Sequence, residues 1–300
     1  MIECNRLIKK YRSHFALKEV SFTLKQGVYG LIGENGAGKS TLFKAIIGEE
    51  RCDQGEILVD GYRPCEGKLK MGYLPQKFDF FHNLTVYESM DYIGILKGID
   101  RKVLKDKVLF WLKQVNLTEQ MHKKVRLLSG GMRQRLGIAQ AFMGDPDYIL
   151  LDEPTVGLDP NERLAFRNMV NETGLDKMIL IATHIIDDVQ ATCENVMVLH
   201  HGSLLYNGTT QGFIERVDRP VYTAQIERSA LPEWNTLLDI ISIKLVNKGM
   251  EIRFFGANNQ RRPENSKRVD CSLEDAYFFA TDLFYRKSES AGGGADEVIG

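Results

Sequence analysis

The spacing of apolar residues along the chain changes from strand-like to helix-like and back again. Near the start, apolar side chains alternate with polar ones, which predicts short, half-buried strands around Leu17, Val20, Phe22 and Leu24. The apolar run at residues 28–32 is typical of a buried strand. Residues 55–61 predict a further strand followed by a turn.

A helical period follows, because apolar positions from residue 84 to about residue 143 recur every three or four residues. Asn83 or Thr85 can begin the first helix, which places four apolar side chains on one face, namely Val86, Met90, Ile93 and Leu96. Residues 102–117 predict a second helix. Residues 132–143 predict a third helix, which Gly144 and Pro146 end.

Short apolar runs then return at residues 148–151, 178–181 and 196–199, with helical stretches between them. This alternation is typical of a parallel sheet covered by helices on both faces. Beyond Thr209 the pattern changes once more. Residues 221–227 and 243–255 predict strands, the second with a turn at 247–249; a charged loop is expected at 261–268, and a helix at 276–285.

The chain is therefore expected to contain a large α/β domain at residues 1–210 and a small α+β extension at residues 211–287. The helical segment, about residues 78–146, would be inserted into the first domain. Residues 288–300 contain three consecutive glycines and predict a disordered tail.

Composition and charge exclude several classes of protein. The 300 residues are 43% hydrophobic and 26% charged, as in ordinary globular proteins, and the net charge of −1 gives no field that attracts nucleic acid. The five cysteines are dispersed without C-x-x-C spacing, which fits a reducing cytosol. No apolar run approaches the roughly 20 residues of a membrane helix, and no signal peptide is expected, so a membrane role would need a partner.

A phosphate-binding loop is the strongest chemical signal. The pattern G-x-x-x-x-G-K-[ST] is met by Gly33, Glu34, Asn35, Gly36, Ala37, Gly38, Lys39 and Ser40. Such glycines let backbone N–H groups surround phosphate oxygens, Lys39 adds positive charge, and the Ser40 hydroxyl can bind Mg²⁺. A predicted strand precedes the loop and a predicted helix at 41–47 follows it, so a helix N-terminus faces the anion.

Two carboxylates end the apolar run at 148–151. Asp152 can hold Mg²⁺, and Glu153 can polarise an attacking water. The alternative is a helix-capping pair, which Pro154 disfavours because a helix does not continue smoothly through proline.

A serine and two glycines precede the helix at 132–143. Ser129 can serve as an ordinary N-cap, but Gly130 and Gly131 lower helix stability, and their advantage would be close approach of bare backbone to an anion. Farther along, His200 and His201 precede Gly202. We interpret them as a hairpin turn rather than a metal site, since no third ligand lies nearby in the sequence.

In this order, these elements resemble the ATP-binding subunit of ABC transporters, over roughly residues 2–209. The resemblance implies a P-loop ATPase core with a mostly parallel sheet, an antiparallel β subdomain and an inserted helical subdomain. It further implies ATP and Mg²⁺ as ligands, with Thr41 near the inner phosphates and Ser40, Gln76 and Asp152 near the metal.

Further residues acquire roles only through the resemblance. Tyr11 would stack on adenine, although it can equally be an exposed loop residue, and Gln76 would sense Mg²⁺ and the γ-phosphate. His184 would contact the γ-phosphate, although a histidine at a strand end is more often structural. Asp159 would lie in a dimer-contact loop, and it can also begin a helix with Glu162 as its capping partner.

The resemblance also implies partners. The phosphate loop of one subunit would face Ser129–Gly131 of another, so we expect a dimer of this chain around two ATP, bound to an integral membrane permease at the cytoplasmic face. Residues 77–87 would dock on the permease, and no nucleic acid is expected. Met132 stands where many members have glutamine, and the sequence Met-Arg-Gln-Arg at residues 132–135 resembles the subgroup that exports peptides and drugs. The alternatives are a soluble ABC ATPase that acts on ribosomes or nucleic acid, and a module that binds ATP without hydrolysis.

Overall fold

The computed structural model describes residues 1–290 except 65, 67, 68, 79, 80, 175, 248, 258 and 259, and for residues 283–290 it describes the backbone only. The chain divides into two compact units, Met1–Gly208 and Thr209–Gly300. The predicted disordered tail lies largely outside the described residues, at 291–300. Residues 288–290 belong to the last helix, α9.

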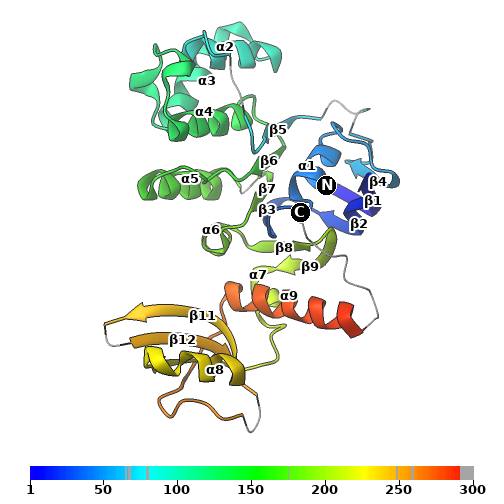
Figure 1. The fold of residues 1–300 in the computed structure, drawn as a ribbon. Helices are drawn as coiled ribbons and strands as arrows, with labels where there is room; N and C mark the ends of the chain where they lie inside the picture. Colours follow the sequence, from blue (N-terminus) through cyan, green and yellow to red (C-terminus); the bar gives the residue numbers. More distant parts are fainter. Residues whose placement is uncertain are drawn as a thin grey trace. The chain divides into compact units, whose positions relative to one another are not determined.

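A six-stranded sheet in the order β5-β6-β7-β3-β8-β9 forms the centre of the first unit (Figure 1). The strands are β3 (Gly27–Ile32), β5 (Met71–Leu74), β6 (Tyr148–Asp152), β7 (Met178–Thr183), β8 (Asn195–His200) and β9 (Ser203–Thr209). From β5 to β8 all neighbouring pairs are parallel. Strands β6 and β7 are buried throughout, because helices cover both faces. The predicted mostly parallel sheet is confirmed.

The antiparallel sheet has the order β2-β1-β4, with β1 (Ile2–Tyr11), β2 (His14–Leu24) and β4 (Gln54–Val59). The expectation of short strands is wrong here. The alternation slips between Leu17 and Val20 because Glu19 adopts a φ of 52°, and the pairing with β1 shifts register there. A bulge thus bends one long strand instead of ending it.

Helix α1 (Lys39–Ile46) lies between the two sheets of the first unit (Figure 1). Its side chains Leu42, Phe43 and Ile46 are fully buried among the inward residues of both sheets. On the other face of the six-stranded sheet lie α5 (Pro160–Thr173) and α6 (Ile186–Thr192). This packing fixes the loop between β3 and α1 at the carboxyl edge of the sheet.

Three helices form the inserted segment: α2 (Val86–Leu96), α3 (Arg101–Gln114) and α4 (Gly130–Phe142), with 3₁₀ turns at Thr118–Gln120 and Val125–Leu127. Of the two proposed starts, Thr85 is the N-cap of α2, and it shares a capping box with Glu88. The second helix begins at the Asp100 cap and ends at Gln114, earlier than predicted. Helix α4 packs on β5, where a Cβ at Gly137 would lie only 2.7 Å from Leu74.

The second unit has a four-stranded sheet in the order β11-β12-β10-β13. Its elements are α7 (Thr210–Ile214), β10 (Val221–Ile226), a 3₁₀ turn (Arg228–Ala230), α8 (Leu231–Leu237), β11 (Asp239–Val246), β12 (Gly249–Phe255), β13 (Lys267–Val269) and α9 (Leu273–Ser290). Ile252 and Phe254 face α8, whereas Phe255 faces Phe279 on α9. Two predictions are corrected: β11 begins before residue 243, and the end of the predicted loop at 261–268 pairs with β10 as β13.

Candidate nucleotide site

The loop between β3 and α1 has little room for side chains at two of its glycines. A Cβ at Gly33 would lie 2.2 Å from the Leu199 carbonyl oxygen, and one at Gly38 would lie 2.3 Å from that of Ala16. Gly38 also has a φ of 106°, a left-handed conformation that favours glycine. The loop backbone is therefore held closely between β2 and β8, with the N-terminus of α1 at its end.

Lys39 is buried at the base of this loop. Its Nζ donates hydrogen bonds to the carbonyl oxygens of Gly33, at 2.6 Å, and Glu34, at 3.1 Å. Burial lowers the pKa of Lys39 below its ordinary value, and the negative charges of Glu153 and Asp152 oppose that change. The ammonium group thus stands beside the carboxylates that end β6.

Asp152 and Ser40 form a direct pair. Ser40 Oγ donates to Asp152 Oδ2 at 2.6 Å, whereas Asp152 Oδ1 is buried and accepts no hydrogen bond within the described part of the chain. Burial raises the pKa of Asp152, the bond from Ser40 opposes the rise, and the nearby Glu153 charge adds to it. A buried, incompletely paired carboxylate oxygen beside a hydroxyl fits a hard cation such as Mg²⁺.

Glu153 adopts a strained backbone conformation, with a φ of 52°. Such outliers persist where surrounding contacts enforce them, often at functional sites. Its buried carboxylate accepts a hydrogen bond from Thr183 Oγ1 at 3.2 Å and lies 2.9 Å from His184 Nδ1 and 3.8 Å from Lys39 Nζ. The capping-pair alternative fails, because the next helix, α5, is capped by Asp159 instead.

These groups open onto one cleft of about 350 Å³. Most of the predicted site residues line it, together with His14, Ala16 and Glu34; the predicted ones are Tyr11, Asn35, Gly36, Gly38, Lys39, Ser40, Thr41, Gln76, Asp152 and Glu153. Gly33 and Ala37 are buried residues of the loop between β3 and α1, and His184 lies against Glu153, which lines the cleft. Tyr11 is partly exposed at the rim, with 43% of its surface accessible.

The remaining predicted residues, Ser129, Gly130, Gly131 and Asp159, are not among the described residues that line the cleft. Ser129 caps α4 and accepts a hydrogen bond from the Met132 amide, and Asp159 forms a capping box with Glu162. A Cβ at Gly131 would lie 3.0 Å from the Gly157 carbonyl oxygen, so the starts of α4 and α5 are neighbours. A Cβ at Gly130 would meet no described atom within 4 Å.

Comparison with known proteins agrees with this geometry. Residues 17–156 match the ABC transporter family. The chain is 35% identical to the ABC transporter ATP-binding protein NatA of Bacillus subtilis (strain 168), over 72% of this chain and 91% of that protein. It is 33% identical to the linearmycin resistance ATP-binding protein LnrL of the same organism, over 72% of each chain. The chain belongs to the ABC transporter family of ATP-binding proteins.

Solved structures of this family have the same fold. A structure of the ATP-binding subunit of an ABC transporter has a TM-score of 0.67 at 28% identity, covering 72% of this chain and 92% of that one. A dimeric ATP-binding cassette in a post-hydrolysis state, bound to ADP and Pi, has a TM-score of 0.63 at 25% identity, covering 70% of this chain and 98% of that one. The present ABC protein is accordingly an ATP-binding subunit with ATPase activity.

Sequence reasoning missed one residue that links the inserted helices of this ABC subunit to the cleft. Gln134 of α4 donates from Nε2 to the carbonyl oxygens of Glu153 and Pro154, both at 3.1 Å. Next to it, Arg135 forms an ion pair with Glu162 at 2.9 Å. Gln134 lies in the Met-Arg-Gln-Arg sequence already singled out, but nothing in that sequence identifies the two carbonyls as its partners.

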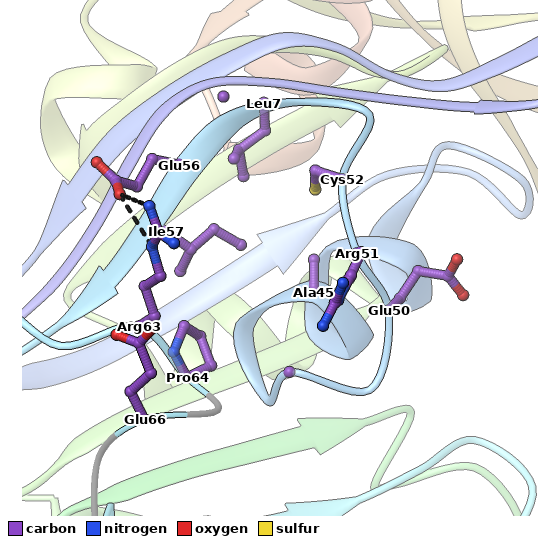
Figure 2. A pocket seen from close by; sticks show the side chains of 12 residues that line it. Leu7, Ala45, Glu50, Arg51, Cys52, Glu56, Ile57, Arg63, Pro64 and Glu66 are labelled. Atoms are coloured by element: carbon purple, nitrogen blue, oxygen red, sulfur yellow. Dashed lines mark hydrogen bonds and ion pairs between the residues drawn. The ribbon is translucent and has the colours of Figure 1, made fainter.

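A separate hollow of about 360 Å³ lies between β1, β4 and the end of α1 (Figure 2). Arg63 and Glu56 form an ion pair at its edge, 3.2 Å apart. None of the predicted site residues is among the described residues that line it, so it is distinct from the nucleotide cleft. Within the described part of the chain, every helix is too short or too polar to cross a membrane.

Proposed function

We propose that two copies of this chain pair head to tail around two Mg-ATP and drive substrate movement through a separate integral membrane permease at the cytoplasmic face. Each composite site would combine the phosphate loop of one copy with Ser129, Gly130 and Gly131 of the other. Such a closed pair has the same contacts on both subunits.

The placement of Gly130 carries this proposal. In the described structure its Cβ position is open and Ser129–Gly131 do not line the cleft, so no contact within one chain explains the glycine. A helix N-terminus with bare backbone is suited to an anion. A second copy would bring that anion, the γ-phosphate held in its own cleft, against Gly130. ADP lacks the γ-phosphate, so hydrolysis would remove the contact and reopen the pair.

Within each cleft the residues would divide the work. Lys39 and the amides of Asn35 to Thr41 would hold the phosphates. Mg²⁺, when bound by Ser40, Asp152 and Gln76, would neutralise charge on the phosphate oxygens. Glu153 would accept a proton from the water that attacks the γ-phosphorus, while the bond to the bridging oxygen of ADP breaks. His184 Nδ1 would hold the Glu153 carboxylate, and Tyr11 would contact the adenine.

Export of a peptide or drug is the direction that we propose. Met132 after the glycine pair is similar to the exporter subgroup, and one relative, at 33% identity, carries the name linearmycin resistance ATP-binding protein. The permease would dock near residues 77–87, of which 79 and 80 lie outside the described residues. Phe81 in this segment is 55% exposed and packs edge-on against Tyr92, which offers an apolar surface to a partner.

Mixing two inactive variants tests the composite site. Lys39→Ala removes the phosphate contact, and Gly130→Asp places a carboxylate where the γ-phosphate of the partner would lie, with space for it within one chain. Each variant alone should lose nearly all ATPase activity. Their mixture should regain activity, because a mixed pair keeps one intact composite site. If the mixture stays as inactive as its components while both remain folded, the two motifs do not meet between chains.

A further inference from the structure

The turn between β8 and β9 lies directly against the phosphate loop. His201 and Gly202, with φ values of 45° and 80°, form this turn, as predicted. The Gly202 amide donates to the Ala37 carbonyl at 3.0 Å, and the Gly202 carbonyl accepts from the Lys18 amide at 2.8 Å. Strands β3 and β8 run parallel with Ile32 opposite Val198, so the residues that follow each strand emerge side by side.

This register also brings a third residue with a metal-ligating side chain to the histidine pair. No third ligand lies near His200 and His201 along the chain, but the fold brings Glu34 of the phosphate loop to them. A carboxylate oxygen of Glu34 and one ring nitrogen from each histidine all lie within 4.8 Å of one another. The sequence alone did not reveal this group of three residues, because Glu34 is more than 160 positions away from the histidines.

The ligand set selects a class of metal. Two imidazoles and one carboxylate suit Zn²⁺ and similar transition cations, whereas Mg²⁺ prefers oxygen ligands alone. Tetrahedral zinc at about 2.0–2.2 Å from each ligand needs ligand atoms about 3.4 Å apart. His200 is buried, while Glu34 and His201 are exposed, so their side chains have space to rotate and bring the ligand atoms closer together.

We propose that Glu34, His200 and His201 form a binding site for a divalent transition cation of the zinc class, with one coordination position open. The site is distinct from the one that Ser40 and Asp152 offer to Mg²⁺. A bound cation would join the start of the phosphate loop to the β8–β9 turn by a second connection beside the Gly202–Ala37 hydrogen bond. The loop and the turn would then open together instead of separately.

The test uses the full-length protein with Zn²⁺ alone as probe, without nucleotide and in millimolar Mg²⁺ to saturate oxygen-only sites. Equilibrium dialysis should give one Zn²⁺ per chain, and Zn²⁺ should raise the Tm. Co²⁺ bound at the same site should show visible absorption bands that are sensitive to nitrogen ligands. Binding that Mg²⁺ displaces would overturn the proposal.

Two ligand variants identify the site. His201→Asn tolerates the left-handed turn conformation, and Glu34→Gln keeps the side-chain shape, so both should fold with the metal-free Tm of the parent. Each should weaken Zn²⁺ binding by at least about tenfold and abolish the Tm rise. His122→Asn, at an exposed histidine elsewhere, and Glu153→Gln should leave Zn²⁺ binding unchanged. Loss of binding in Glu153→Gln, or retention in His201→Asn, would place the cation elsewhere and contradict the proposal.

Discussion

Glu153 Oε1 and His184 Nδ1 lie 2.9 Å apart, and their residues follow the neighbouring parallel strands β6 and β7. The backbone of Glu153 is in the left-handed region. Because β6 pairs with β7, Asp152 lies opposite Ala182, and the residues that follow meet at the same edge. A carboxylate fixed by an imidazole on one side and by Thr183 on the other has little freedom to rotate. Glu153 also lines the nucleotide cleft.

Replacing Glu153 by Gln should lower kcat by about 100- to 10,000-fold, the range for loss of a general base, and leave ATP affinity nearly unchanged. The variant should accumulate as an ATP-bound dimer, measurable by sedimentation. His184→Ala should lower kcat as well, and the double variant should lose less than the product of the two effects, because the residues act as a unit. Glu172→Gln on the exposed surface is the control. Normal turnover in Glu153→Gln would remove that residue from the role.

Asp152 should contribute to function at the expense of stability. Its raised pKa means that the folded protein binds the proton more tightly than the unfolded chain, so burial of the charge destabilises the fold progressively as pH rises above the ordinary Asp value of 3.8. Asp152→Asn should therefore raise the Tm at neutral pH, by about 2–4 °C for each kcal/mol relieved, and raise it less toward acid pH.

The same variant should weaken retention of Mg-ATP and nearly abolish hydrolysis, since the buried oxygen that fits the cation is lost. Ser40→Ala should also weaken Mg-ATP retention, but without the gain in Tm, because it leaves the Asp152 charge in place and removes its hydrogen bond. Calorimetric melts without nucleotide, together with ATP binding at fixed Mg²⁺, separate the two effects. Equal melting curves for the parent and Asp152→Asn would contradict the prediction that burying the Asp152 charge destabilises the folded protein.

Gln134 should act as a positioning residue. Its side-chain amide joins α4 to the carbonyls of Glu153 and Pro154, so its removal leaves the nucleotide contacts intact but frees the strained turn that aims Glu153. Gln134→Leu should lower kcat about tenfold or more with little change in KM, since small displacements of a catalytic group reduce rate strongly. Gln114→Leu, at an exposed glutamine at the end of α3, is the matched control. A rise in KM at constant kcat would indicate a binding role instead.

Sites made of residues close together in the sequence could be predicted, whereas sites made of residues far apart in the sequence could not be predicted from the residues alone. The phosphate loop could be predicted because its residues are contiguous and a strand and a helix flank it. The meeting of Glu153 with His184 could be anticipated only through family resemblance, since it depends on which strands are neighbours. The proximity of Glu34 to His200 and His201 could not be predicted, because it requires both the β3–β8 pairing and its register.

Three strands, β5, β2 and β13, were missed or wrongly divided because their sequence patterns are short, interrupted or charged. The four-residue strand β5 carries too short an apolar pattern to be distinguished from a loop. In β2 the bulge at Glu19 disrupted the alternation, and one long strand was predicted as several short ones. In the second unit β13 is charged and pairs along only one edge, so it resembles a loop in sequence.

The most consequential polar contact of the second unit joins Arg253 of β12 to Asp275 of α9. Arg253 donates from Nε to Oδ1 at 2.7 Å and from a second nitrogen to Oδ2, and Asp275 is fully buried. Burial alone would raise the pKa of Asp275, but the bonds from Arg253 and Ser272 outweigh it and hold the pKa below its usual range. The pair thus stabilises the folded unit at all pH values above 3.8 and ceases to do so as pH falls through the lowered pKa.

Arg253→Met should destabilise the second unit by about 3–5 kcal/mol, because a buried carboxylate is left without its partner. Hydrogen exchange of the full chain should show faster exchange in β10, β12 and α9, the elements that enclose the pair. Arg261→Met removes an exposed pair with Glu233, with side-chain exposures of 71% and 51%, and should cost less than about 1 kcal/mol. Lowering the pH below about 3.8 should reduce the difference in the free energy of unfolding between the parent and Arg253→Met. Protonated Asp275 carries no charge, so the loss of the guanidinium then costs less. Equal protection in the two arginine variants would show that Asp275 is stabilised without Arg253.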